Sequence, residues 1–179
     1  MEVFSTSAQA ILGAAVDVGI GIAGFSGIIL ALMPDWFRKR QPLTLRWALQ
    51  VLVFTCLVMI GFSMLPFVIV EMGFQAKVWQ VCSAVYVTYF PLITYFRFKQ
   101  GLIAARRERE AWQGRSYFVA NAAAIGLTAI WLLQIANVAY IREAWPFLLF
   151  IVYYMLFAFG HFANFLLVII SDQEKAGDA

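Results

Sequence analysis

Residues 10–33 read AILGAAVDVGIGIAGFSGIILALM, a run in which Asp17 is the one charged residue. An α-helix rises about 1.5 Å per residue, so about 20 apolar residues reach across the roughly 30 Å hydrocarbon core of a bilayer. In lipid only helices and closed barrels satisfy their own backbone, and the alternating segments of barrel strands are missing from this sequence. The run therefore predicts a transmembrane helix.

Four further apolar runs follow along the chain, at residues 47–70, 78–96, 117–140 and 145–170. The 179-residue chain is 63% hydrophobic and 13% charged, whereas a soluble domain is about 45–50% apolar and about 25% charged. A soluble chain of this composition would expose large apolar patches to water and aggregate. This excludes a soluble enzyme, a nucleic-acid-binding protein and a disordered regulator. We predict an all-α integral membrane bundle, with five transmembrane helices in a single domain that covers residues 1–179.

Positive charge is concentrated in two of the four loops between the predicted spans. The first loop holds Arg38, Lys39, Arg40 and Arg46, and the third holds Arg97, Lys99, Arg106, Arg107, Arg109 and Arg115. The other two loops hold one cation each, Lys77 and Arg142. Loops on the cytoplasmic side carry the excess of Lys and Arg, so we expect the N-terminus outside and the C-terminus inside.

The first span has small residues on two opposite faces. At 100° per residue these faces consist of Gly13, Asp17, Gly21 and Gly24 on one side, and of Gly19, Ala23, Ser26 and Gly27 on the other. Small residues let two helix backbones approach closely, so we expect helix packing on both faces and a central position for this helix.

Asp17 is the strongest anomaly within the spans. A carboxylate in lipid costs at least about 2.5 kcal/mol, so we expect Asp17 to point into the bundle or toward a subunit interface. In one interpretation it binds a cation or relays a proton. In the other it is a hydrogen-bonding group that ties helices together.

The remaining polar-core or pathway candidates lie in three other spans. They are Gln80, Ser83 and Thr94 in the third span, Gln134 and Asn137 in the fourth, and His161 and Asn164 in the fifth. The chain has a single histidine, and its two cysteines, Cys56 and Cys82, lie within apolar runs. We therefore expect no metal site, no disulfide framework and no cofactor.

Two residues in the spans raise a hydrogen-bonding problem. Pro91 has no N–H and frees a backbone carbonyl in mid-span, which either lines a pathway or is satisfied by a neighbouring helix. Trp131 also lies in mid-span, where its indole N–H needs a partner or a helix interface. The span at 47–70 is almost entirely apolar, and we expect it to face lipid.

Two functions follow most directly from these residues. The first is an oligomeric channel or transporter-like pathway for protons or small cations, because ionisable residues within membranes are functional candidates. Five helices hardly enclose a wide pore, so a homo-oligomer is expected. The alternative is a non-conducting accessory or assembly subunit that docks on another membrane protein. The expected partners are membrane lipids, further copies and membrane proteins, with no nucleic acid and no enzymatic activity.

A remote alternative is an intramembrane serine hydrolase. Gly24-Phe25-Ser26-Gly27 resembles the GxSG motif of rhomboid proteases, which pair a serine with a histidine from another span, here Ser26 with His161. The chain departs from that family because it lacks a sixth span and a preceding histidine–asparagine pair. The structural alternative is that the Ser26 hydroxyl bonds to the carbonyl one turn earlier in its own helix.

A second resemblance rests on the same helix. IAGFSGI at residues 22–28, the basic loop that follows and SMLP at residues 63–66 resemble small multi-pass bacterial inner-membrane proteins that have no assigned activity. This resemblance implies a location in the bacterial inner membrane and no catalytic residue.

Overall fold

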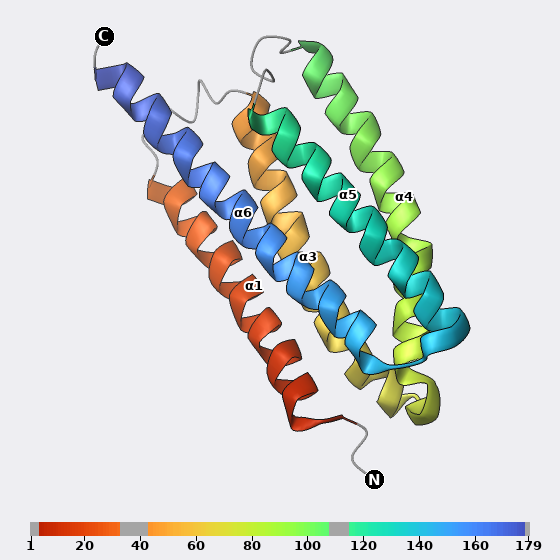
Figure 1. The fold of residues 1–179 in the computed structure, drawn as a ribbon. Helices are drawn as coiled ribbons and strands as arrows, with labels where there is room; N and C mark the ends of the chain where they lie inside the picture. The colour runs from red at the N-terminus through yellow and green to blue at the C-terminus, as the bar shows by residue number, and fades with distance from the viewer. Residues whose placement is uncertain (1–3, 33–42, 108–114, 178–179) are drawn as a thin grey trace. The chain divides into compact units, whose positions relative to one another are not determined.

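A computed structural model describes residues 4–32, 43–107 and 115–177 (Figure 1). Within these ranges five long helices follow one another: α1 (Thr6–Leu32), α3 (Leu43–Glu71), α4 (Val78–Arg107), α5 (Arg115–Ala136) and α6 (Ala144–Gly177). The short 3-10 helix η1 (Gln75–Lys77) joins α3 to α4, and the π-helix η2 (Asn137–Ile141) extends α5. The all-α prediction with five helices is confirmed.

Three of these helices are long and apolar enough to cross a membrane. Among the described residues, these stretches are Thr6–Ile29, Leu49–Glu71 and Ala144–Leu167, and Ile125–Ile141 is a shorter apolar helix. They indicate a membrane protein. Helix α4 continues to Arg107, well past the predicted end of its span, so part of the third predicted loop is helical.

The chain divides into two compact units. Unit 1 consists of Met1–Ala8 and Leu65–Phe150, and unit 2 consists of Gln9–Met64 and Ile151–Ala179. Helices α1, α3 and α6 each contribute residues to both units. Each unit has its own core.

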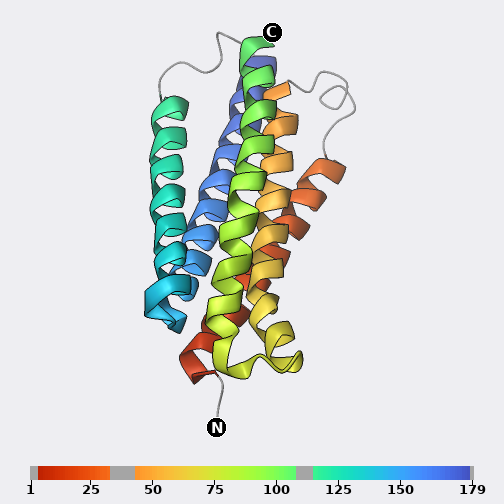
Figure 2. The same cartoon turned by 90° about the vertical axis from the view of Figure 1, so that its right-hand side faces the viewer.

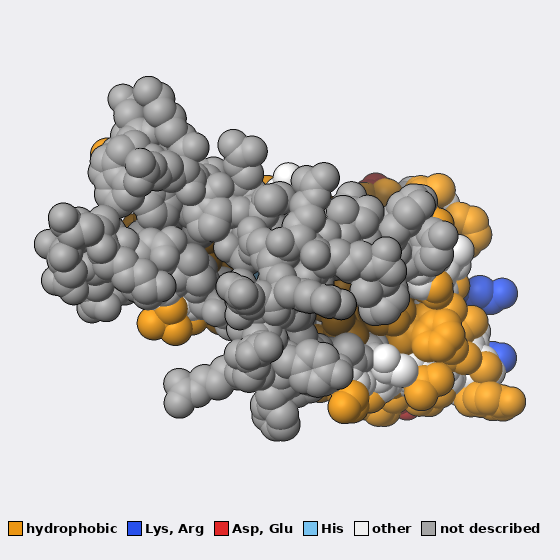
Figure 3. Space-filling model, turned by 90° about the horizontal axis from the view of Figure 1, so that it is seen from above, with side chains coloured by type: hydrophobic (Ala, Val, Ile, Leu, Met, Phe, Trp, Pro, Cys, Tyr) orange, Lys and Arg blue, Asp and Glu red, His pale blue; other side chains and the backbone are white. Residues whose placement is uncertain are grey.

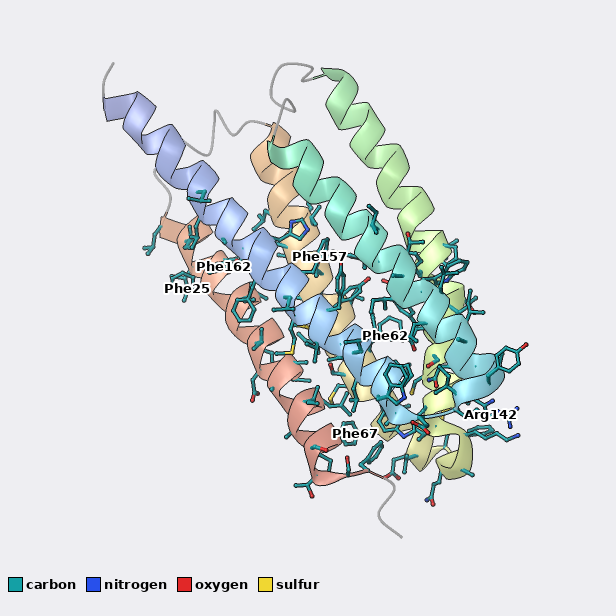
Figure 4. The ribbon with its side chains drawn as sticks, in the orientation of Figure 1. Phe25, Phe62, Phe67, Arg142, Phe157 and Phe162 are labelled. Atoms are coloured by element: carbon teal, nitrogen blue, oxygen red, sulfur yellow. The ribbon has the colours of Figure 1, made fainter. Side chains whose placement is uncertain are left out.

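The core of unit 2 forms where α1, α3 and α6 meet. Its buried members are Ile22, Leu52, Cys56, Ala158 and Phe165. At its edge, Phe25 of α1 packs edge-on against Phe162 of α6, with ring centroids 5.7 Å apart (Figure 4).

The lipid-facing position expected for residues 47–70 is wrong for one side of α3, which supplies buried core residues of unit 2, whereas Leu57 on another side is exposed. Leu52, Cys56 and Met59 are each 0% exposed. An apolar side chain loses little by exchanging lipid for a close-packed protein neighbour, since both environments are apolar. Composition alone therefore does not distinguish a core helix from a lipid-facing one.

The core of unit 1 is rich in aromatic side chains. Tyr86 of α4 packs against Phe150 of α6, with ring centroids 4.1 Å apart, and Phe147 contacts both Phe150 and Trp79. Helices α4 and α5 contact each other, and η2 leads from α5 toward α6 (Figure 2).

Much of the described surface is apolar. Leu32, Ile125, Leu156 and Tyr140 are among its most exposed large hydrophobic residues. In the view of Figure 3, hydrophobic side chains cover most of the described surface, and a few basic side chains lie at one edge. Such a surface suits contact with lipid or with apolar protein, not with water.

Candidate functional site

Three of the predicted polar residues form a buried hydrogen-bonded cluster in unit 1. The Ser83 hydroxyl of α4 donates to Gln134 Oε1 of α5 at 2.7 Å. The same hydroxyl oxygen accepts a hydrogen bond from Asn137 Nδ2 at 2.8 Å. All three side chains are 0% exposed. Ser83 thus joins α4 to the end of α5, and the structure brings together residues that lie more than 50 positions apart in the sequence.

The remaining polar atoms of this cluster bond to the backbone of the α5–α6 turn. Asn137 Oδ1 accepts from the Glu143 amide at 3.0 Å, while Asn137 Nδ2 also donates to the Glu143 carbonyl at 3.1 Å. Gln134 Nε2 donates to the carbonyl of Pro146, in the first turn of α6, at 2.7 Å. The amide side chains therefore supply the hydrogen bonds that water supplies to the backbone of an exposed turn.

Gln80 satisfies a backbone carbonyl of the π-helix η2. Its Nε2 donates to the Val138 carbonyl at 2.9 Å, one turn of α4 away from Ser83. The π-helix closes where the Arg142 amide donates to the Asn137 carbonyl at 3.1 Å, and Arg142 has the left-handed φ of 59°. Such a reversal exposes helix-end carbonyls that need donors, and Gln80 supplies one of them.

Trp131 resolves both of the hydrogen-bonding problems in the spans. Its indole Nε1 donates to the Val87 carbonyl at 3.1 Å. Val87 lies four residues before Pro91, so this is the carbonyl that the missing Pro91 N–H leaves without a helical donor. The freed carbonyl is satisfied by a neighbouring helix, which was one of the two alternatives, and the indole N–H has the partner that it needs.

The chemistry available in this polar cluster is limited. Gln80, Ser83, Gln134 and Asn137 carry amides and a hydroxyl, none of which exchanges a proton near neutral pH. Their bonds connect helices and cap a turn, which stabilises the fold of unit 1. Among the described residues, no three His, Cys, Asp or Glu side chains come together as metal ligands.

Unlike the buried polar cluster of unit 1, Asp17 lies on an exposed face of α1 in unit 2. Its side chain is exposed, and no hydrogen bond or ion pair is found for it among the described residues. Gly13, Gly21 and Gly24 share this face, and a Cβ built on any of them would have no atom of the described residues within 4 Å. The expectation that Asp17 points into the bundle is therefore wrong within unit 2. The other expectation, a subunit interface, stays a prediction.

The second glycine face of α1 does pack, as expected, over most of its length. A Cβ on Gly19 would lie 2.7 Å from Ile60 Cγ1 of α3, so only glycine fits there without a shift. Ala23 packs against the unit 2 core and Ser26 is buried. Gly27, in contrast, is exposed with open space beside it. Within unit 2, the described neighbours of α1 therefore lie on one side of the helix, and the expected packing on both faces is not found there.

The Ser26 hydroxyl donates to the Ile22 carbonyl in its own helix at 2.7 Å. This is the structural alternative given for the GxSG segment. His161 is half-buried, with its ring edge-on to Phe157 at a centroid distance of 4.3 Å. The side chains of Thr94 and Asn164 lie outside the described part of the structure, although both positions are helical.

One residue of the open surface was overlooked in the sequence. Ala10 lies within about 20° of Asp17 on the helix wheel and is exposed. Its signal was present, since it continues the spacing of Gly13 and Asp17 by one turn. We call Ala10, Gly13, Asp17, Gly21 and Gly24 the open face of α1.

Comparison of this chain with protein-family models, with curated proteins and with solved structures finds no match.

Proposed function

We propose that this chain is a small multi-pass membrane protein that acts as a non-conducting accessory or assembly subunit. In this proposal it docks on another membrane protein along the open face of α1. The observation that carries the proposal is the contrast between the two glycine faces of one helix. On one face, Gly19 allows close contact with Ile60 of α3. On the other, Gly13, Gly21 and Gly24 have the same small size but no neighbour among the described residues.

The polar cluster of unit 1 favours this function over conduction. A conducting pathway needs polar groups that are free to exchange partners with a passing ion or proton. The hydrogen bonds of Ser83, Gln134 and Asn137 instead join these side chains to one another and to backbone groups at the α5–α6 turn. Opening a pathway here would break bonds that hold two helices and a turn together.

The proposal retains the topology derived from the sequence. It places five spans in the membrane, the N-terminus outside and the basic loops inside, in a bacterial inner membrane as the resemblance implies. The three apolar helices α1, α3 and α6 support a membrane location.

Two measurements test the proposal. The first is proton and potassium flux into liposomes that contain the purified protein or its Asp17→Asn variant. We expect both proteins to match empty liposomes. Flux that is present in the wild type and falls in the variant would favour the channel instead.

The second measurement is photo-crosslinking in intact membranes. A side chain that carries a diazirine replaces Ile20, which lies beside the open face and is 59% exposed. Leu57 on α3, 60% exposed, is the matched control position. We expect a discrete protein adduct from position 20, lost when Gly21→Leu is added, and only lipid adducts from position 57. Lipid adducts alone at both positions would contradict the proposal.

A further inference from the structure

We infer that the occupant of the open face of α1 is a membrane-spanning helix of a different protein that carries a Lys or Arg side chain level with Asp17. This inference rests on the proposed function and names the partner's chemistry. Three observations carry it: the shape of the face, the unpaired carboxylate at its centre, and the distribution of positive charge along the chain.

The open face has the shape of a shallow track for one helix. Its five residues lie within about 40° of one line on the helix wheel and extend over about 21 Å, or four turns. In the described part of the chain, no atom lies within 4 Å of the Cβ positions of Gly13, Gly21 or Gly24. Ile20, 59% exposed, lies beside the track, and Ile28, 57% exposed, lies on its line one turn beyond Gly24, so both offer apolar side chains to a helix seated on the track.

Asp17 gives this track a chemical requirement. It lies inside the 24-residue apolar stretch Thr6–Ile29, which is long enough to cross a membrane. Lipid offers no hydrogen-bond donor to a carboxylate, and ionisable residues in membrane helices pair with one another or face a polar interior. Because Asp17 has no hydrogen-bond or ion-pair partner among the described residues, it needs a donor or a cation from the occupant of the track.

The charge distribution excludes a second copy as the source of that cation. All 13 Lys and Arg residues of the chain lie outside the five predicted spans. Two copies related by a two-fold axis along the membrane normal would place Asp17 against Asp17. Two neighbouring carboxylates do not both ionise readily, so this arrangement disfavours the charged pair. A cation from a different chain neutralises Asp17 at the same depth.

The test uses designed peptides as probes in phosphatidylcholine vesicles. Two single-span helices of Leu and Ala carry the same Ala stripe and differ only in a central Lys or Leu. Energy transfer from a donor on the full-length protein to an acceptor on the peptide measures binding. We expect the Lys peptide to bind the wild type about tenfold more tightly than the Leu peptide. Asp17→Asn should bring the two affinities together, and Leu57→Ala, away from the track, should leave the tenfold preference unchanged.

Other outcomes separate this inference from the proposed function. Equal binding of the two peptides to the wild type, still weakened by Gly21→Leu, would overturn the cation and leave the docking face. Energy transfer between labelled copies of the protein that depends on Asp17 would make a second copy the occupant and also overturn the inference. No binding of either peptide would overturn it as well, while the crosslinking at position 20 decides the proposed function independently.

Discussion

The indole of Trp131 and the carbonyl of Val87 form a hydrogen bond of 3.1 Å that joins α5 to α4. This bond repairs the defect that Pro91 makes in the backbone of α4, because Val87 lies one turn before the proline. The carbonyl that Pro91 leaves without a helical donor in α4 therefore forms a specific hydrogen bond with α5.

A double-mutant cycle tests this relationship. Trp131→Phe should destabilise the protein by about 1–3 kcal/mol, because it leaves the Val87 carbonyl without a donor in an apolar setting. Pro91→Ala restores the helical N–H, so Trp131→Phe should cost much less in that background. Unfolding in mixed micelles of increasing denaturing-detergent fraction measures both differences. Equal costs in the two backgrounds would show that the indole contributes only through packing.

Removal of the Ser83 hydroxyl tests the polar cluster. Ser83→Ala takes the donor from Gln134 and the acceptor from Asn137, so we expect a loss of about 1–3 kcal/mol. Thr88→Ala is a matched control on the same helix, since the Thr88 hydroxyl is exposed and bonds only to the Ala84 carbonyl. Its effect should stay within about 0.5 kcal/mol. Similar losses from the two changes would argue against a structural role for the cluster.

Ser63 should behave in the opposite way. Its hydroxyl is buried in α3, and no hydrogen-bond partner is found for it among the described residues. A buried polar group without a partner destabilises the folded state, so Ser63→Ala should be neutral or stabilising by up to about 1 kcal/mol. Thermal unfolding of detergent-solubilised protein provides the measurement. A clear drop in the unfolding temperature would reveal a partner for this hydroxyl.

The two glycine faces of α1 should respond differently to the same substitution. Gly19→Leu forces a side chain into Ile60 and should destabilise the isolated chain by about 1–3 kcal/mol. Gly21→Leu enters open space and should change the stability of the isolated chain by less than about 0.5 kcal/mol. It should, however, weaken docking along the open face. If Gly21→Leu destabilises the isolated chain as much as Gly19→Leu, this face is covered by the chain itself.

The sequence by itself determined the all-α class and the five helices. Apolar runs of about 20 residues cannot remain in water, and in lipid they satisfy their backbone as helices. The sequence also identified the two groups that needed partners, the carbonyl freed by Pro91 and the indole of Trp131, because backbone covalent chemistry creates those needs locally. The Ser26 hydroxyl bond to Ile22 was foreseeable for the same reason, since its acceptor lies one turn away.

Only the tertiary structure decided which partners meet and which surfaces are covered. Ser83 and Asn137 are 54 residues apart, and no local pattern specifies that they share a bond. From composition we expected α1 to be central and α3 to face lipid, whereas α3 supplies buried core residues and α1 has an open face. The physical reason is that lipid and protein interior are equally apolar, so hydrophobicity places a helix in the membrane without assigning its neighbours. Those neighbours are selected by shape and by hydrogen bonds between segments that are distant in the chain.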